Sequence, residues 1–114
     1  MLPSNVLKIR YHLSGAGRSP FEEWFSSLDS AARAKVAVAI ARLEQGNTSN
    51  VKSVGKGVLE YRINFGPGYR VYFGRDRATL VILLIGGTKK RQQQDVATAA
   101  GLWADYKKRK GFSG

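Results

Sequence analysis

The stretch VLEYRINFGPGYRVYFG, residues 58–74, contains the clearest structural pattern in this chain. Apolar and polar residues alternate on both sides of a Gly-Pro-Gly corner at 66–68, a pattern typical of a β-hairpin. A hairpin centred on that corner pairs residues whose numbers sum to about 134. Two faces follow, the first expected to lie under helices and the second to be polar: Leu59, Tyr61, Ile63, Val71 and Phe73, then Glu60, Arg62, Asn64, Arg70 and Tyr72.

The residues before the hairpin predict a strand and two helices. Residues 6–13 alternate as a strand does, and Ser19-Pro20-Phe21-Glu22 has the pattern of a capped helix start. Asp29 is placed to cap a second helix that runs to about Gln45. Residues 48–57 are polar and contain glycine, so we expect a connecting segment there. The apolar faces of the two helices predict a helical hairpin packed on a sheet.

A buried strand and a third helix are expected after the hairpin. Residues 79–85 are continuously apolar, as in a central strand buried on both faces, and Gly86-Gly87 is expected to end it. Thr88 is placed to cap a C-terminal helix, which a basic tail at 107–114 follows. The predicted order βααβββα favours one α+β domain over residues 1–114, with a mainly antiparallel, twisted sheet packed against the helical hairpin.

Charge is the most unusual feature of the composition. Nineteen Lys and Arg against eight Asp and Glu give a formal net charge of +11, which attracts nucleic acid, an acidic protein or a membrane surface alike. The absence of cysteine excludes disulfides and agrees with a reducing cytoplasm, where we expect the protein to stay. The apolar run Leu80–Ile85 is too short to span a bilayer. The single histidine, His12, is interpreted as a strand residue, and no metal or cofactor is expected because no metal-ligand spacing is present.

Five cations are expected to converge at one end of the polar face. Arg62 and Arg70 are neighbours across the hairpin, and the run Lys89-Lys90-Arg91 lies close to the N-terminus of the last helix. Because that end of a helix carries partial positive charge, these cations favour an anionic ligand such as phosphate. The structural alternative is that Glu60 pairs with Arg62 or Arg70 and that the basic run is a solubilising edge.

The same cluster has the parts for binding and cleaving RNA. Attack of a ribose 2′-hydroxyl on its own phosphate needs a proton acceptor, a proton donor and cations for the developing charge. Arginine supplies such a cation without changing its protonation, and a lysine among arginines is a candidate for proton transfer. Tyr69 and Tyr72 are candidates for stacking on bases. This chemistry requires no metal.

Several short motifs, taken in their order and spacing, resemble one known family. The motifs are Phe21-x-x-Trp24, Arg42-Leu43-x-x-Gly46-Asn47, Val58-Leu59-Glu60-Tyr61-Arg62-Ile63, Gly66-Pro67-Gly68-Tyr69-Arg70-Val71-Tyr72-Phe73 and Leu83-Leu84-Ile85-Gly86-Gly87-x-Lys89-Lys90-x-Gln92-x-x-Asp95-Val96. Across about residues 6–100 the chain resembles the addiction-module killer proteins, the HigB-like branch of the RelE/ParE toxin superfamily.

That resemblance implies a RelE-like fold, a HigA-like, DNA-binding antitoxin encoded beside the toxin, and cleavage of messenger RNA on the ribosome. By position, Arg70 matches the arginine used on the scissile phosphate, and Asp95 matches a recurring acidic position. The run Lys89-Lys90-Arg91 takes the place of the second basic group. The residues expected to be catalytic are Arg70, Lys89, Lys90 and Asp95, and those expected to bind RNA are Arg62, Tyr69, Tyr72, Arg91 and Gln93.

The resemblance leaves the general acid and base open. Glu60 stands where RelE-type enzymes have a lysine, and residues 92–95 contain neither the tyrosine nor the histidine of such enzymes. Tyr106 lies too far along its helix to replace them. Two further functions therefore stay open, a ParE-like inhibitor that binds DNA gyrase and a basic RNA-binding protein without toxicity. Under the nuclease hypothesis, Arg70→Ala is expected to abolish toxicity with little effect on thermal stability.

Overall fold

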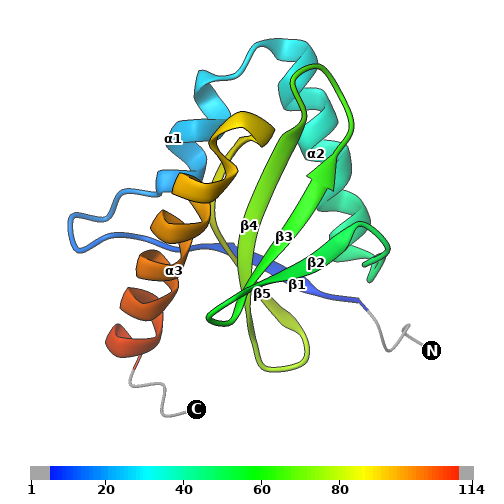
Figure 1. Cartoon of the computed structure of the whole chain (residues 1–114). Coiled ribbons are helices and arrows are strands. Elements are labelled where there is room, and N and C mark those ends of the chain that lie inside the picture. The colour runs from blue at the N-terminus through cyan, green and yellow to red at the C-terminus, as the bar shows by residue number, and fades with distance from the viewer. Residues whose placement is uncertain (1–5, 111–114) are drawn as a thin grey trace.

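A five-stranded sheet with helices on both faces forms the centre of the protein (Figure 1). The computed structural model describes residues 6–110. The strand order is β1-β5-β4-β3-β2, and only the β1–β5 pair is parallel, so the predicted α+β class with a mainly antiparallel sheet is confirmed. The elements are β1 (Lys8–Tyr11), α1 (Pro20–Ser27), α2 (Ser30–Glu44), β2 (Val51–Gly55), β3 (Val58–Ile63), β4 (Tyr69–Asp76), β5 (Leu80–Thr88), the 3-10 helix η1 (Lys89–Arg91) and α3 (Gln92–Arg109).

The helical hairpin begins where the capping pattern predicts. The Ser19 hydroxyl accepts a hydrogen bond from the Glu22 backbone N–H at 3.0 Å, and the Asp29 carboxylate accepts one from the Ala32 N–H at 2.8 Å. Each bond satisfies a backbone donor that the first turn of a helix leaves free. Helices α1 and α2 therefore start one residue after their predicted caps.

The hairpin at 58–74 has the two predicted faces with a slightly different register. Arg62 pairs with Arg70 and Glu60 pairs with Tyr72, so paired numbers sum to 132. A shift of two residues leaves every side chain on its expected face, because the side-chain period of a strand is two. The geometry confirms that Arg62 and Arg70 are neighbours on one face of the sheet.

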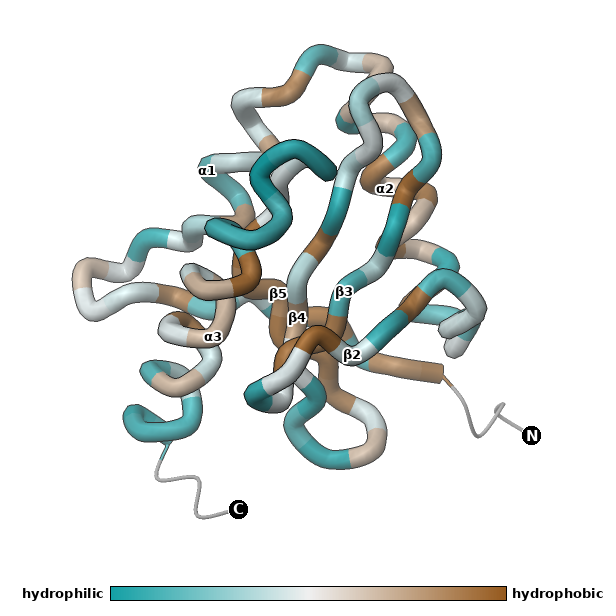
Figure 2. Tube along the Cα trace, viewed as in Figure 1, coloured by the Kyte–Doolittle hydropathy of each residue, from teal (hydrophilic) through white to brown (hydrophobic). Residues whose placement is uncertain are grey.

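Two hydrophobic cores lie on opposite faces of the sheet, and this corrects the prediction that the second face of the hairpin is polar. Helices α1 and α2 cover the first face through residues such as Phe21, Val36 and Leu43. Helix α3 covers part of the second face, where Trp103 packs in one cluster with Tyr72. Strand β5 supplies hydrophobic residues to both cores, and Figure 2 shows its hydrophobic colour at the centre of the molecule. The polar face is therefore accessible to solvent only where α3 does not cover it.

A strand occupies the segment that the sequence predicts as a connection. Strand β2 pairs antiparallel with β3, so the order of elements is βααββββα. Its turn into β3 has positive φ angles at Gly55, Lys56 and Gly57. The polar, glycine-bearing composition that suggested a loop is instead that of an exposed edge strand with a tight turn.

The Gly86-Gly87 pair does not end its strand, because β5 continues to Thr88. A Cβ atom on Gly86 would lie 2.2 Å from the Trp24 ring, and one on Gly87 would lie 1.9 Å from the Asp95 carboxylate. The glycines thus allow side chains from α1 and α3 to approach the strand from opposite faces.

The C-terminal helix also begins and ends differently from its prediction. Thr88 makes no side-chain capping bond, and η1 precedes α3. Helix α3 includes the first part of the predicted basic tail, whereas residues 111–114 lie outside the described residues. Within residues 6–110, no helix combines the length and the apolar character needed to cross a membrane.

Candidate functional site

A buried carboxylate, Glu60 of β3, joins three structural elements. Its Oε1 accepts hydrogen bonds from Arg62 Nε and from Arg70 Nη1, each at 3.0 Å. Its Oε2 accepts a hydrogen bond from Gln92 Nε2 of α3 at 2.8 Å. The Glu60 side chain is 0% exposed, whereas that of Arg62 is 45% exposed. Glu60 therefore fixes a largely buried arginine and a half-exposed one at the point where α3 meets the sheet.

The surroundings of Glu60 favour its ionised form. Burial raises the pKa of this carboxyl, but hydrogen bonds from Arg62 and Gln92 and the charge of Arg70 outweigh that effect. The net result is a pKa below the ordinary value. The network is consequently a carboxylate held between cations at neutral pH.

The cations of η1 adjoin this network through the hairpin corner. The Lys89 backbone N–H donates to the Gly68 carbonyl at 2.8 Å, and a Cβ on Gly68 would lie 3.4 Å from the Lys89 Cβ. The side chains of Lys89, Lys90 and Arg91 are exposed. Among residues 6–110, neither Lys89 nor Lys90 has an ion-pair partner, so both ammonium groups are available to an anion. Figure 2 shows the chain in the hydrophilic colour at the start of α3.

Asp95 is the second buried carboxylate near these cations. It packs against Gly87, the strand partner of Arg70. Its Oδ1 lies 3.9 Å from Arg91 Nε, and its buried Oδ2 has no hydrogen-bond partner among the described residues. Burial raises the pKa of Asp95, and the charge of Arg91 offsets this only in part. Asp95 therefore stays protonated to a higher pH than an ordinary aspartic acid does.

The structure brings together most of the residues that the sequence assigned to the site. Arg62 and Arg70 form its base, the basic run 89–91 lies beside them, and Asp95 is in the first turn of α3. The remaining predicted residue, Gln93, lines an open depression at the start of α3 together with Lys90, Arg91 and Gln94.

Both tyrosines predicted to stack on bases are buried, and this part of the prediction is wrong. Tyr69 lies on the other face of the sheet, where its ring packs against Trp24 and stacks on Phe65. Tyr72 is 0% exposed in the core beneath α3. Burial and the nearby carboxylates of Glu60 and Asp95 also raise the pKa of Tyr72, so its hydroxyl stays protonated. Neither ring is open to a base.

Gln92 is a site residue that the sequence did not identify, and the role of Glu60 was left as an alternative. Glu60 in fact pairs with both arginines at once. Its place on the polar face was a usable signal, but its contact with Gln92 spans 32 residues and depends on how α3 docks.

His12 and Tyr106 lie outside the Glu60 network, but His12 comes directly after β1, whereas the sequence predicts it within the strand. The Tyr106 hydroxyl donates to Asp76 at 2.6 Å near the C-terminal end of α3. The His12 side chain is buried, with Nε2 3.2 Å from the Asp105 carboxylate. Within residues 6–110, no group of three or more His, Cys, Asp or Glu is placed to hold a metal ion.

A mixed α/β domain with a basic surface built on a hairpin and a helix start is compatible with the RelE-like class of small toxins. Residues 23–100 match the family described as Phage derived protein Gp49-like (DUF891), and the chain belongs to that family. It is a RelE/HigB-like family associated with toxin–antitoxin toxins, which suggests an antitoxin partner. The chain is also similar to an uncharacterized protein of Haemophilus influenzae (strain ATCC 51907 / DSM 11121 / KW20 / Rd), with 45% identity over 80 residues, 69% of this chain and 81% of the relative.

Proposed function

We propose that the protein is the toxin of a type II toxin–antitoxin module and cleaves messenger RNA on the ribosome until an antitoxin neutralises it. One observation carries this proposal: Glu60 holds Arg62 and Arg70 beside Lys89 and Lys90 of η1, which have no ion-pair partner among the described residues. Such a cluster is suited to a phosphate at which negative charge develops. Membership of the Gp49-like family supports the toxin assignment.

The proposed reaction joins the ribose 2′-oxygen to the adjacent phosphorus and breaks the bond from phosphorus to the 5′-oxygen. The 2′-hydroxyl loses a proton, and the leaving 5′-oxygen gains one. Arg70 stabilises the charge on the scissile phosphate, whereas Arg62 and Arg91 bind the neighbouring part of the RNA. Lys89 or Lys90, in the neutral amine form left after its ammonium group has lost a proton to solvent, is the candidate for accepting the first proton.

Asp95 is the candidate for supplying the second proton. The raised pKa of Asp95 favours a protonated carboxyl. Asp95 packs against Gly87 of β5, which pairs with Arg70 on the neighbouring strand β4. A carboxyl whose pKa is raised by burial is better suited to act as a general acid than an ordinary aspartic acid. These roles use side chains alone, as the resemblance to RelE and HigB enzymes implies.

The ribosome and messenger RNA are the partners of this reaction, and the cytoplasm is its place. The antitoxin is proposed to be a HigA-like, DNA-binding protein encoded beside the toxin. The +11 net charge of the chain supports both an RNA substrate and an acidic inhibitor.

Brief induction followed by mapping of RNA 5′ ends tests the proposal. We expect growth arrest and new 5′ ends within translated transcripts, and few in the same RNA when its translation is blocked. Intact transcripts during arrest would contradict the nuclease function. Unimpaired growth at high expression would instead favour a basic RNA-binding protein without toxicity.

A ParE-like inhibitor of DNA gyrase is the second candidate. It is favoured by the lack of a histidine or an open tyrosine beside Arg70 in the described residues, since His12 and Tyr106 lie elsewhere and Tyr72 is buried. An inhibitor that acts by binding needs no general acid or base. A rising DNA-damage response with intact transcripts would select this function.

A further inference from the structure

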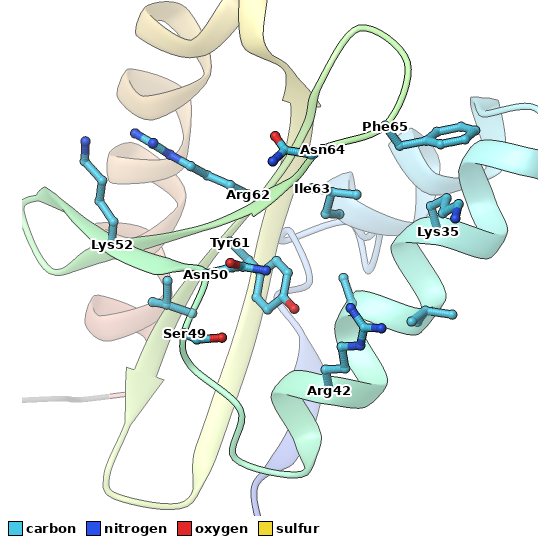
Figure 3. Close-up of a pocket in the computed structure, with 13 residues that line it drawn as sticks. Lys35, Arg42, Ser49, Asn50, Lys52, Tyr61, Arg62, Ile63, Asn64 and Phe65 are labelled. Carbon is cyan, nitrogen blue, oxygen red and sulfur yellow. The ribbon is translucent and has the colours of Figure 1, made fainter.

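A groove that shares Arg62 with the Glu60 network lies between α2 and the strands β2 and β3. Lys35 and Arg42 of α2 lie on one side, and Ile63 of β3 lies on the opposite one (Figure 3). The lining also includes Val38 of α2 and Val51 of β2. The candidate catalytic residues Arg70, Lys89, Lys90 and Asp95 do not line it. A ligand of this groove would therefore be distinct from RNA bound at the candidate catalytic residues.

The charge of the groove points to an acidic occupant. Its lining contains the cations Lys35, Arg42, Lys52 and Arg62 and no carboxylate. Figure 3 shows Lys35 and Arg42 on the α2 wall, whereas the side chains of Lys52 and Arg62 extend from the strands away from α2. An acidic chain in the groove would thus meet positive charge along the α2 wall, with two further cations at the strand side of its rim.

The remaining lining is suited to apolar side chains and to an extended backbone. Val38 is 48% exposed and lines the groove, and Val51 and Ile63 are partly buried nearby. Strand β2 is at the edge of the sheet, with β3 as its one neighbour in the strand order. An edge strand presents backbone N–H and C=O groups with which an extended peptide can pair.

The aromatic residues of the groove favour a peptide over RNA. Single-stranded RNA is held largely by stacking of bases on open aromatic rings. Tyr61 is buried, and the Phe65 ring already has Lys35 Nζ 5.2 Å from its centroid and the Tyr69 ring stacked at 6.5 Å. Neither ring of the groove is free to receive a base.

We propose that this groove binds an extended, acidic segment of the antitoxin. The apolar side chains of the segment lie on Val38, Val51 and Ile63, and its carboxylates pair with Lys35 and Arg42. The identification of the antitoxin as the protein that supplies this segment rests on the proposed function. Because Arg62 lines the groove and also binds Glu60, a segment seated here reaches the border of the candidate catalytic site.

Binding of a defined probe tests the groove without any measurement of toxicity. The probe is a fluorescein-labelled, acetylated octapeptide of alternating Glu and Val, and its anisotropy is measured at low and moderate salt. Amide chemical shifts are mapped in parallel and are expected to move along β2 and the facing side of α2. The double variant Lys35→Glu/Arg42→Glu should bind roughly tenfold more weakly, as expected for losing two partly exposed ion pairs.

A matched variant controls for net charge. Lys8→Glu/Lys108→Glu makes the same charge change at exposed residues outside the groove and should bind the peptide as the unmodified protein does. Equal weakening by both variants, or no binding by the unmodified protein, would refute the groove. Competition by an octauridylate RNA that is lost only in the groove variant would show that the occupant is RNA.

The two proposals fail separately. Growth arrest should persist in the Lys35→Glu/Arg42→Glu variant, because neither residue belongs to the candidate catalytic site. A protein that binds the peptide but arrests no growth contradicts the toxin function and leaves the groove intact. A protein that arrests growth but binds no peptide contradicts the groove alone.

Discussion

Arg70 Nη1 and Glu60 Oε1 lie 3.0 Å apart, and both side chains are buried. The residues belong to adjacent strands and are ten positions apart in the chain. The arginine proposed to act on phosphate is therefore also half of an internal ion pair. Its substitution must affect folding as well as function, so each variant needs a stability measurement.

Arg70→Ala should destabilise the protein strongly. Removal of one partner from a buried ion pair leaves the other charge poorly compensated and costs about 3–5 kcal/mol of unfolding free energy. This replaces the expectation from sequence that stability would hardly change. Urea unfolding gives the measurement, and Arg62→Ala is the control, with an expected loss below about 1 kcal/mol because that side chain is 45% exposed. Equal midpoints for Arg70→Ala and the unmodified protein would refute the buried pair.

The cations of η1 should show the opposite behaviour. Lys89→Ala/Lys90→Ala removes two exposed side chains, so the unfolding free energy should change by less than about 1 kcal/mol, as for surface positions. Growth arrest should be lost, because both side chains are proposed to act on RNA. Lys108→Ala, at an exposed position of α3 outside η1, should leave arrest intact. Full toxicity of the double variant would remove both lysines from the site.

Gly87→Ala should disturb the docking of α3. The added methyl group would lie 1.9 Å from Asp95 Oδ2, so the carboxylate and the first turn of α3 must move. We expect a loss of about 1–3 kcal/mol, as for overpacking elsewhere in protein cores. Gly101→Ala is the matched control, because nothing lies within 4 Å of its added Cβ. That change should stabilise α3 by about 0.5–1 kcal/mol.

The two buried carboxylates should respond to pH with opposite signs. Since the pKa of Asp95 is raised on folding, its ionisation costs stability as pH rises through the folded-state pKa. Asp95→Asn should therefore raise the melting temperature at pH 7, and the gain should disappear below about pH 4, where the carboxyl is protonated in both states. Abolished growth arrest in the same variant would support the catalytic role of Asp95.

Glu60→Gln provides the comparison. The pKa of Glu60 is lowered on folding, so its contribution to stability is present above the unfolded-state pKa and is lost as pH falls through the folded-state pKa. The variant should melt at a lower temperature at pH 7, and the difference should narrow in acid. A pH-independent difference for both variants would show that charge does not cause either effect.

The candidate site could be predicted in part from sequence. The alternation in 58–74 placed Arg62 and Arg70 on one face, and the strand geometry confirms it. The pattern could not show that Tyr72 is buried on that same face, because α3 covers it with residues such as Trp103 from much later in the chain. The composition of a strand specifies its two faces but not which one a distant helix will cover.

Local sequence patterns are enough to predict the helix starts at Ser19 and Asp29 and the two faces of the hairpin, since capping and alternation involve residues a few positions apart. The continuation of the strand through Gly86-Gly87 and the hydrogen bond from Gln92 to Glu60 depend on the packed structure. Both outcomes depend on α1 and α3 docking against the sheet. In sequence, a glycine pair is equally compatible with the end of a strand and with a strand position on which a side chain packs closely. Only the neighbouring helices distinguish the two.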